Sequence, residues 1–348
     1  MKRIMRITLY LVALAAAGFL VAASGLIPVT ESPGDYASTR WFMQFAKRRS
    51  IETHSLRVRA PSLESPALVL RGAGHYETTC RVCHGAPSFP RTQIALGMEP
   101  PPPNLAGRVP TWSDGELFSI VKHGIMFSGM PAWPEPQRDD EVWAMVAFLR
   151  RLPGLGPAEY RRLSGLDVTP AAAGTEACAR CHGPDGRGRG AAAFPRLAGQ
   201  SPTYLRLALE AYSRGGRRSG IMRSVLVGMT PEQVEAVSNY YGGLAPLTMA
   251  AAVPVSNDRG AGIALRGIPE QGVPSCSDCH GPGPGVRNPA YPRLDGQYED
   301  YLILQLELFA SQRRGGSRYA HIMQQVAPRL KPEQMRDVAR FYASRGAP

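Results

Sequence analysis

The six cysteines of this 348-residue chain fall into three copies of one pattern, and none is left over. Each copy reads Cys-x-x-Cys-His, and the first cysteines of successive copies are 98 residues apart. The cysteines are Cys80, Cys83, Cys178, Cys181, Cys276 and Cys279, and the histidines that follow them are His84, His182 and His280. A repeat this regular predicts three similar structural units.

This pattern is typical of covalent haem attachment. Two thiols form thioethers to the porphyrin, and the adjacent histidine binds the iron. A single Cys-x-x-Cys could instead belong to a thioredoxin-like redox site or to half of a zinc site. Neither zinc nor a disulfide framework requires a histidine directly after the second cysteine three times over. The sequence therefore predicts three covalently bound haem c groups, with the three histidines as iron ligands.

The amino terminus has the form of a membrane anchor. Lys2, Arg3 and Arg6 precede an apolar stretch from Ile7 to Ile27, which as a helix would be about 31 Å long and could cross a bilayer. A cleaved secretory signal is the alternative, because Val21-Ala22-Ala23 would suit a signal peptidase. We expect an uncleaved single-pass anchor, residues 1–28, in the cytoplasmic membrane of a bacterium, with the haem domains in the periplasm.

The segment 29–64 is expected to be a juxtamembrane linker. Its aromatic and basic residues could lie at the level of the lipid headgroups; they are Trp41, Phe42, Phe45, Lys47, Arg48 and Arg49. The chain carries a formal net charge of +12, which six haem propionates would reduce. A basic surface favours acidic protein partners or anionic lipid, and no nucleic-acid-binding motif is present.

Other features recur with the cysteines and define three units: residues 65–155, 165–245 and 255–348. Each unit is predicted to close with an amphipathic helix, and these begin at Asp139, Thr230 and Lys331. The intervening stretches Leu152 to Gly174 and Leu244 to Gly260 are rich in Pro, Gly and Ala and are predicted to be linkers. The second and third units share the sequence Pro-Arg-Leu-x-Gly-Gln and a basic Arg-Gly-Gly segment.

With these motifs, each unit resembles a class I cytochrome c domain, and the resemblance covers residues 65 to 348. The second and third units are similar to the two halves of di-haem c-four cytochromes, which carry electrons to terminal oxidases. The first resembles single-haem domains in which the ligand methionine lies in Gly-Met-Pro-Ala, here residues 129–132. The resemblance implies a mostly α fold: three tandem cytochrome c domains, in each of which a first and a last helix cross near the haem edge. The short, alanine-rich stretch before Cys178 departs from that pattern.

The resemblance also implies further haem contacts. An early proline lends its carbonyl to the proximal histidine, a role that falls to Pro103, Pro195 and Pro292. Methionine is the implied second axial ligand, and the candidates at similar distances after the motif histidines are Met130, Met222 and Met323. Buried methionines also commonly fill gaps in apolar interiors.

Other residues compete for these roles. Met229 is an alternative to Met222, but aligning the second and third units places it on Leu330, which predicts a packing role. His123 and His321 lie near the candidate methionines and could bind iron in their place. His54 and His75 are expected at the surface. The arginine-rich loops 214–218 and 313–318 are expected to be solvated faces, or alternatively to pair with propionates or dock acidic partners.

A haem iron with a histidine on one axial position and a methionine on the other favours outer-sphere electron transfer at a high reduction potential. We therefore expect an electron carrier without catalytic residues. Its donor would be a quinol-oxidising complex or a dehydrogenase, and its acceptor a terminal oxidase. The alternatives are a cytochrome subunit of a periplasmic quinoprotein or flavin dehydrogenase, or a haem enzyme with one open site.

Overall fold

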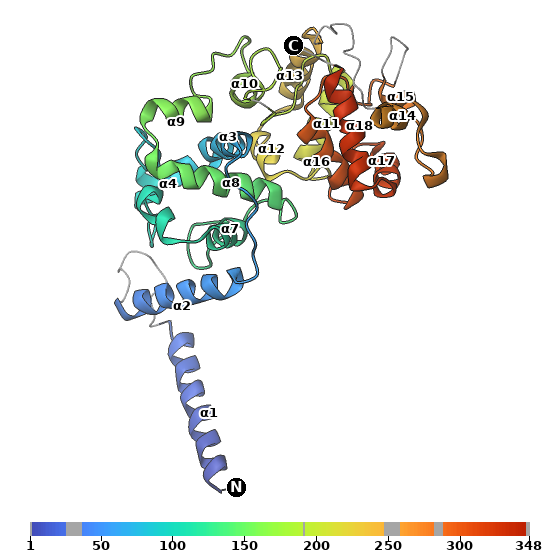
Figure 1. The fold of residues 1–348 in the computed structure, drawn as a ribbon. Coiled ribbons are helices and arrows are strands. Elements are labelled where there is room, and N and C mark those ends of the chain that lie inside the picture. The colour runs from blue at the N-terminus through green and yellow to red at the C-terminus, as the bar shows by residue number, and fades with distance from the viewer. Residues whose placement is uncertain (1, 26–36, 191, 247–257, 282–287, 346–348) are drawn as a thin grey trace.

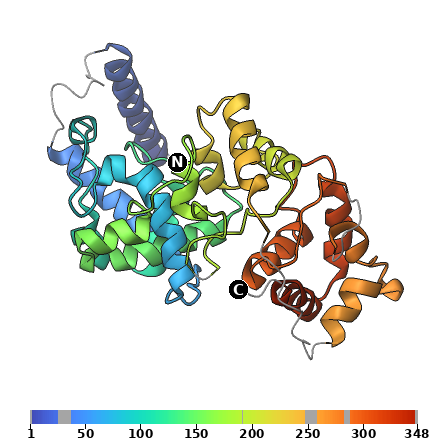
Figure 2. The ribbon, with the colours of Figure 1, turned by 90° about the horizontal axis from the view of Figure 1, so that it is seen from above.

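This computed structural model describes residues 2–25, 37–190, 192–246, 258–281 and 288–345. Within these ranges the chain is helical and forms no β-strand, which confirms the mostly α fold. Three groups of helices follow one another in space as they do in sequence, with the second between the first and the third (Figures 1 and 2). We call residues 66–166 domain 1, residues 174–246 domain 2 and residues 258–345 domain 3.

Two helices precede domain 1. Helix α1, Lys2–Ala23, is long and apolar enough to cross a membrane and has no buried residue, and it stands apart from the other helices (Figure 1). The first residue of the predicted anchor 1–28 and its last three residues lie outside the described residues. The predicted linker 29–64 contains a 19-residue helix, α2, Ala37–Ser55. This helix packs on α7 (Asp114–His123) of domain 1, and the Arg48 guanidinium carbon lies 4.9 Å from the centroid of the Trp112 ring.

Domain 1 is organised around two crossing helices, α3 (Pro66–His75) and α8 (Asp139–Arg151). A glycine makes the close crossing possible, since a Cβ on Gly72 would lie 2.1 Å from the Ala144 carbonyl oxygen. Tyr76 and Phe148 are fully buried beside this crossing. The remaining α-helices of the domain are α4 (Arg81–His84), α5 (Gln93–Leu96), α6 (Leu105–Arg108), α7 (Asp114–His123) and α9 (Pro157–Ser164).

Helix α9 corrects the first predicted linker. Tyr160 on this helix is fully buried in the core of domain 1, and its hydroxyl donates to Glu77 Oε2 at 2.7 Å. Residues 157–164 are therefore part of domain 1, because an amphipathic turn of Tyr and Leu buries its apolar side there. Most of the second predicted linker, 244–260, lies outside the described residues.

Domains 2 and 3 share one arrangement with one difference. Domain 2 has α10 (Glu176–His182), α11 (Pro202–Ser213), α12 (Gly220–Val225) and α13 (Pro231–Gly243). Domain 3 has the corresponding helices α15 (Ser277–His280), α16 (Glu299–Ala310), α17 (Ala320–Val326) and α18 (Pro332–Ser344), and in addition a first helix, α14 (Asp258–Arg266). Helix α14 packs on α18, so within the described ranges only domain 3 of this pair has its own first helix.

The closing helices begin where their sequences predict. Thr230 accepts a hydrogen bond from the Gln233 backbone amide and Pro231 occupies the first helical position, so α13 is capped locally. Helix α18 has the same proline, at Pro332, directly after Lys331. Helix α8 carries three acidic residues in its first turn and two arginines in its last, a charge order that suits the helix dipole.

Candidate functional site

The three motif histidines are held in one way. Each ends a helix, and its Nδ1 lies within hydrogen-bond distance of a proline carbonyl oxygen: 3.1 Å from His84 to Pro103, 3.0 Å from His182 to Pro195 and 2.9 Å from His280 to Pro292. A carbonyl oxygen can only accept, so Nδ1 carries the proton in each ring. Each Nε2 is then unprotonated and able to bind iron.

A tyrosine supports the turn after each histidine. The hydroxyls of Tyr76, Tyr241 and Tyr342 donate to the carbonyl oxygen of the glycine that follows the motif, at 2.6, 3.2 and 2.8 Å. Those glycines have φ values of 68° to 89°, a region that other residues rarely adopt. The turns are therefore held from inside the domain.

Domains 2 and 3 share one cavity of about 340 Å³, which residues of domain 1, among them Arg138 and Glu141, also line. It brings together the predicted attachment and axial residues of both units: Cys178, Cys181, His182, Met222, Cys276, Cys279, His280 and Met323. Met229 packs instead on a cluster formed by Leu205, Val237 and Tyr241. His321 is exposed. The cavity thus places a histidine and a methionine from each domain around a common space.

In domain 1, Cys80 packs against the core formed by α3 and α8. The predicted ligand Met130 is half-buried in a loop whose turn is closed by Ile125 N–H donating to the Met130 carbonyl at 3.1 Å. Met98 lies beside this loop, since a Cβ on Gly129 would be 2.1 Å from Met98 Cε. His123, the competing ligand, is exposed.

His75 is not at the surface, which corrects the sequence prediction. Only 3% of it is exposed, and its ring centroid lies 4.5 Å from that of Trp133. Burial lowers the pKa of His75 to about 4. His75 lies on the face of α3 that packs on the core. The helical periodicity of the apolar residues around it could have predicted this burial. His54 is exposed.

Burial raises the pKa of four motif thiols, Cys80, Cys178, Cys181 and Cys276, to about 11. Burial penalises a thiolate but not a thioether, which carries no charge. The apolar surroundings of these four positions therefore suit a covalently linked porphyrin.

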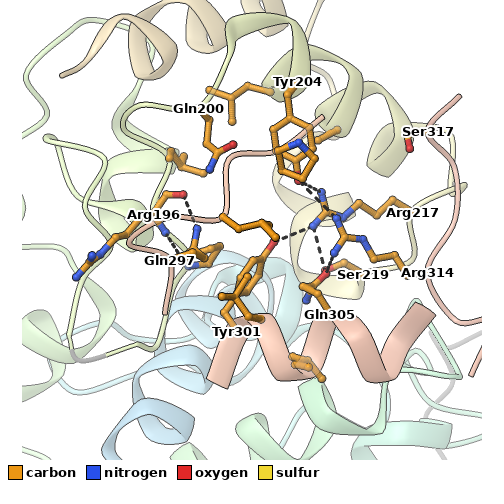
Figure 3. A pocket seen from close by; sticks show the side chains of 18 of the residues that line it. Arg196, Gln200, Tyr204, Arg217, Ser219, Gln297, Tyr301, Gln305, Arg314 and Ser317 are labelled. Atoms are coloured by element: carbon orange, nitrogen blue, oxygen red, sulfur yellow. Dashed lines mark hydrogen bonds between the residues drawn. The ribbon is translucent and has the colours of Figure 1, made fainter. Parts of the chain in front are cut away.

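Two arginines face each other in the shared cavity (Figure 3). Arg217 and Arg314 both donate to Tyr204 Oη, at 3.4 and 3.5 Å, and both reach Gln305 Oε1, at 3.4 and 2.5 Å. Arg217 also donates to Tyr301 Oη at 2.9 Å. Among the described residues, neither forms an ion pair with a carboxylate. Burial and the charge of Arg217 lower the pKa of Arg314, so this site favours an added anion.

These two arginines correct the expectation that both arginine-rich loops are simply solvated. Arg217 is only 7% exposed. The exposed members of the loops are Arg214, Arg218 and Arg318. The loops therefore contain both buried and exposed arginines, a division that their sequences do not show.

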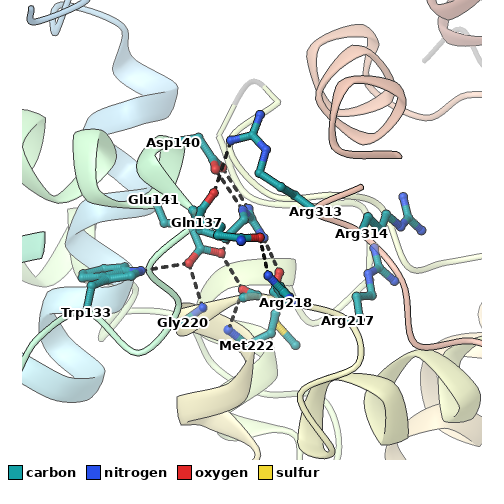
Figure 4. A network of polar contacts seen from close by, with 12 residues as sticks. Trp133, Gln137, Asp140, Glu141, Arg217, Arg218, Gly220, Met222, Arg313 and Arg314 are labelled. Carbon is teal, nitrogen blue, oxygen red and sulfur yellow. Dashed lines mark hydrogen bonds and ion pairs between the residues drawn. The ribbon is translucent and has the colours of Figure 1, made fainter. Parts of the chain in front are cut away.

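A buried carboxylate joins domain 1 to domain 2 (Figure 4). Glu141 on α8 accepts hydrogen bonds from Trp133 Nε1 at 3.2 Å, Ser219 Oγ at 2.6 Å and Gly220 N at 2.8 Å. Arg138 lies 3.0 Å from it as an ion-pair partner. Burial nevertheless raises the pKa of Glu141.

Glu141 lies between two predicted ligand positions. Trp133 follows Met130 by three residues in domain 1, and Ser219 caps α12, where its Oγ accepts from Met222 N–H at 3.1 Å. No sequence pattern predicts the hydrogen bonds of Glu141, because its partners are brought together only by the packing of two domains.

Comparisons with known proteins find cytochrome c domains in two parts of the chain. A family model described as cytochrome C oxidase, cbb3-type, subunit III matches residues 67–149, and a cytochrome c model matches residues 171–244. A thiosulfate dehydrogenase electron acceptor of Thiomonas intermedia is 35% identical, over 48% of this chain and 77% of that protein.

A cytochrome c4 of Thiocapsa roseopersicina is 33% identical, over 47% of this chain and 84% of that protein. A solved cytochrome c4 of Acidithiobacillus ferrooxidans is 30% identical, with a TM-score of 0.42, over 48% of this chain and 98% of that one. With its three attachment motifs, this chain therefore belongs to the class I c-type cytochromes, as an electron-transfer protein that carries three covalent haem c groups.

Proposed function

We propose that this chain is a membrane-anchored periplasmic relay with two closely placed haems in domains 2 and 3 and a third in domain 1. The observation that carries the proposal is the shared cavity, in which residues of both attachment motifs and both candidate methionines line one space. Haem c supplies a one-electron carrier there. Each iron would be held by one histidine and one methionine, namely His84 and Met130, His182 and Met222, and His280 and Met323, and such a pair would leave no open position for substrate.

Arg217, which is buried, and Arg314, which is half-buried, fit the propionates of this pair. Arg217 and Arg314 have only neutral acceptors around them in the described structure, and a carboxylate would compensate both charges. One arginine comes from each domain, so the propionates would help to hold domains 2 and 3 together.

The relatives favour a dehydrogenase as electron donor. Two of them are described as thiosulfate dehydrogenase electron acceptors, so we propose that a periplasmic dehydrogenase reduces this chain and that a terminal oxidase accepts its electrons. Helix α1 would keep the relay at the membrane, close to such an oxidase.

Substitution of the candidate methionines tests the ligation. Met222→Ala and Met323→Ala should each abolish about one third of the methionine-to-iron absorbance in the red and lower the potential of one haem, because a soft neutral ligand that favours the ferrous form is lost. Met229→Leu is the matched control and should leave all three haems intact. Loss of the absorbance in Met229→Leu, with Met222→Ala unchanged, would reverse the assignment in domain 2.

The donor can be tested by rapid mixing. Reduction of the purified full chain by a thiosulfate-oxidising dehydrogenase should be faster than reduction by a quinol-oxidising complex. The reverse order would return the quinol-oxidising complex to the position of donor, while leaving the ligand assignment untouched.

A further inference from the structure

Domains 2 and 3 are joined by a crossed pair of glutamine contacts, of which Figure 3 shows the one between Arg196 and Gln297. Gln297 of domain 3 accepts from Arg196 N–H at 3.0 Å and donates to the Arg196 carbonyl oxygen at 3.0 Å. Gln200 of domain 2 makes the same two contacts with Arg293, at 3.0 and 2.7 Å. Gln200 is 7% exposed and Gln297 5%, so both bind out of water.

One of the two contacts of each glutamine, the one from the arginine N–H, falls on a peptide group that already serves a proximal histidine. The carbonyl oxygen of Pro195 accepts from His182 Nδ1, and the N–H of the same peptide unit, on Arg196, donates to Gln297. The peptide between Pro292 and Arg293 lies in the same way between His280 and Gln200. Each proximal histidine is thus connected, through one peptide group, to a side chain of the other domain.

A peptide group transmits polarisation between its two ends. When its N–H donates to an acceptor, its carbonyl oxygen becomes more negative and accepts a stronger hydrogen bond. A stronger bond from histidine Nδ1 makes the imidazole more basic and a better ligand for ferric iron. A glutamine on the peptide N–H should therefore lower the potential of the haem bound by that histidine.

We propose that Gln297 and Gln200 are crossed positioning residues, in which each glutamine strengthens the proximal-histidine hydrogen bond of the other domain and lowers the reduction potential of that domain's haem. Gln297 acts on the haem of His182, and Gln200 acts on the haem of His280. The joint between the domains is then part of the redox tuning of the pair. The proposal rests on the histidine ligation proposed above.

Domain 1 shows the contrast. Its proline carbonyl also accepts from the proximal histidine, but Asn104 stands where the other domains have arginine, and its side chain caps α6 by accepting from Ala106 N–H at 3.0 Å. The repeated Pro-Arg-Leu-x-Gly-Gln sequence is the signal for the crossed contact, because it supplies both the peptide and the glutamine.

The test is a redox titration of the full haem-loaded chain, followed by NMR so that each haem is resolved. Gln297→Leu should raise the potential of the domain 2 haem, with a shift of up to about tenfold in the ferrous-to-ferric equilibrium, or about 59 mV for one electron. The domain 3 haem should change less, although the substitution is in domain 3. Gln200→Leu should give the reciprocal result.

The sign separates tuning from simple loosening of the joint. Entry of water would favour the more highly charged ferric form and lower the potential, which is opposite to the predicted change. Arg196→Leu removes a guanidinium that donates to the Gly296 carbonyl across the joint but leaves the peptide group, so it should not raise the domain 2 potential. Gln93→Leu, at an exposed position of domain 1, is the control for the type of substitution.

A second variant covers the case in which the leucine variants do not mature. Gln297→Glu keeps an acceptor, now charged, on Arg196 N–H and should lower the domain 2 potential more than the domain 3 potential. The NMR chemical shift of the Nδ1 proton of His182, measured in the ferrous protein, should change in opposite directions in the two variants. The proposal would be overturned if the reduction potentials did not change, or if they changed mainly in the domain that carries the substitution. A lower domain 2 potential in Gln297→Leu would also overturn it. An unchanged methionine-to-iron absorbance in these variants would show that the axial ligation itself still stands.

Discussion

Domains 2 and 3 carry nearly the same motifs but differ in what completes them. Domain 3 has its own first helix, α14, which packs on its closing helix α18. Domain 2 lacks such a helix among its described residues, and α3 of domain 1 lies against its haem-attachment segment: a Cβ on Gly74 would be 3.0 Å from Cys181 Sγ. Arg189 of domain 2 also donates to the carbonyls of Arg162 and Leu163 in α9, at 2.5 and 2.6 Å.

This difference shows that similar haem motifs do not make equally independent domains. Helix α3 serves two domains, by crossing α8 in domain 1 and by packing on α10 in domain 2. Domain 2 should therefore depend on domain 1 for its stability, whereas domain 3 should not. Each of the following predictions tests that comparison.

The largest expected effect comes from separating the domains. Residues 255–348, exported alone, should bind one haem and unfold cooperatively, whereas residues 165–245 alone should retain little haem, because their attachment segment loses α3 and α9. Haem content per chain and thermal unfolding measure the difference. Residues 65–245 are the control and should restore the second haem. A stable, haem-loaded fragment 165–245 would contradict the comparison.

Acid should destabilise domains 1 and 2 before domain 3. His75 on α3 has its pKa lowered by burial to about 4, so between pH 6.5 and 4 the unfolded chain binds more protons than the folded one. Stability is then lost as pH falls through this window, by up to about 3 kcal/mol. Denaturant titrations at pH 7 and pH 4, followed at each haem, measure it. His75→Phe should remove this pH dependence, and His54→Gln, at an exposed position, should not.

A smaller effect is expected from filling the contact between α3 and domain 2. Gly74→Val should push α3 away from Cys181 and cost about 1–3 kcal/mol by overpacking. The loss should appear in the unfolding of domain 2 and leave domain 3 unchanged. Gly107→Val is the control, since no atom lies within 4 Å of a Cβ there. Equal destabilisation of domains 2 and 3 would indicate that α3 supports the whole molecule.

The smallest effect concerns a feature that the two domains share. Tyr241→Phe and Tyr342→Phe each remove a hydroxyl that donates to the glycine after the haem motif, at a cost of about 0.5–1.5 kcal/mol. Each substitution should lower the melting temperature of its own domain only. Tyr10→Phe in α1, where the ring is 75% exposed, should have no effect. A loss in the neighbouring domain would show that the two turns are coupled.

Local patterns in the sequence determined the cofactor and much of the framework. The Cys-x-x-Cys-His motifs specify haem attachment through residues that are adjacent in sequence. The closing helices begin either at a capping residue followed by proline or at an acidic first turn. Both features are local and do not depend on packing between distant residues. The proline carbonyls lie 12 to 19 residues from their histidines, and were inferred from the family resemblance rather than from the pattern alone.

Contacts between distant residues were decided only by the tertiary structure. Gln297 forms a hydrogen bond with Arg196, 101 positions away in the sequence, and Ser219 with Glu141, 78 positions away. No local sequence pattern at one partner identifies the other. The same reason explains the burial of Arg217 and the sharing of α3. These features follow from how complete domains pack on one another, since burial and polar pairing depend on the surface that each domain presents to its neighbour.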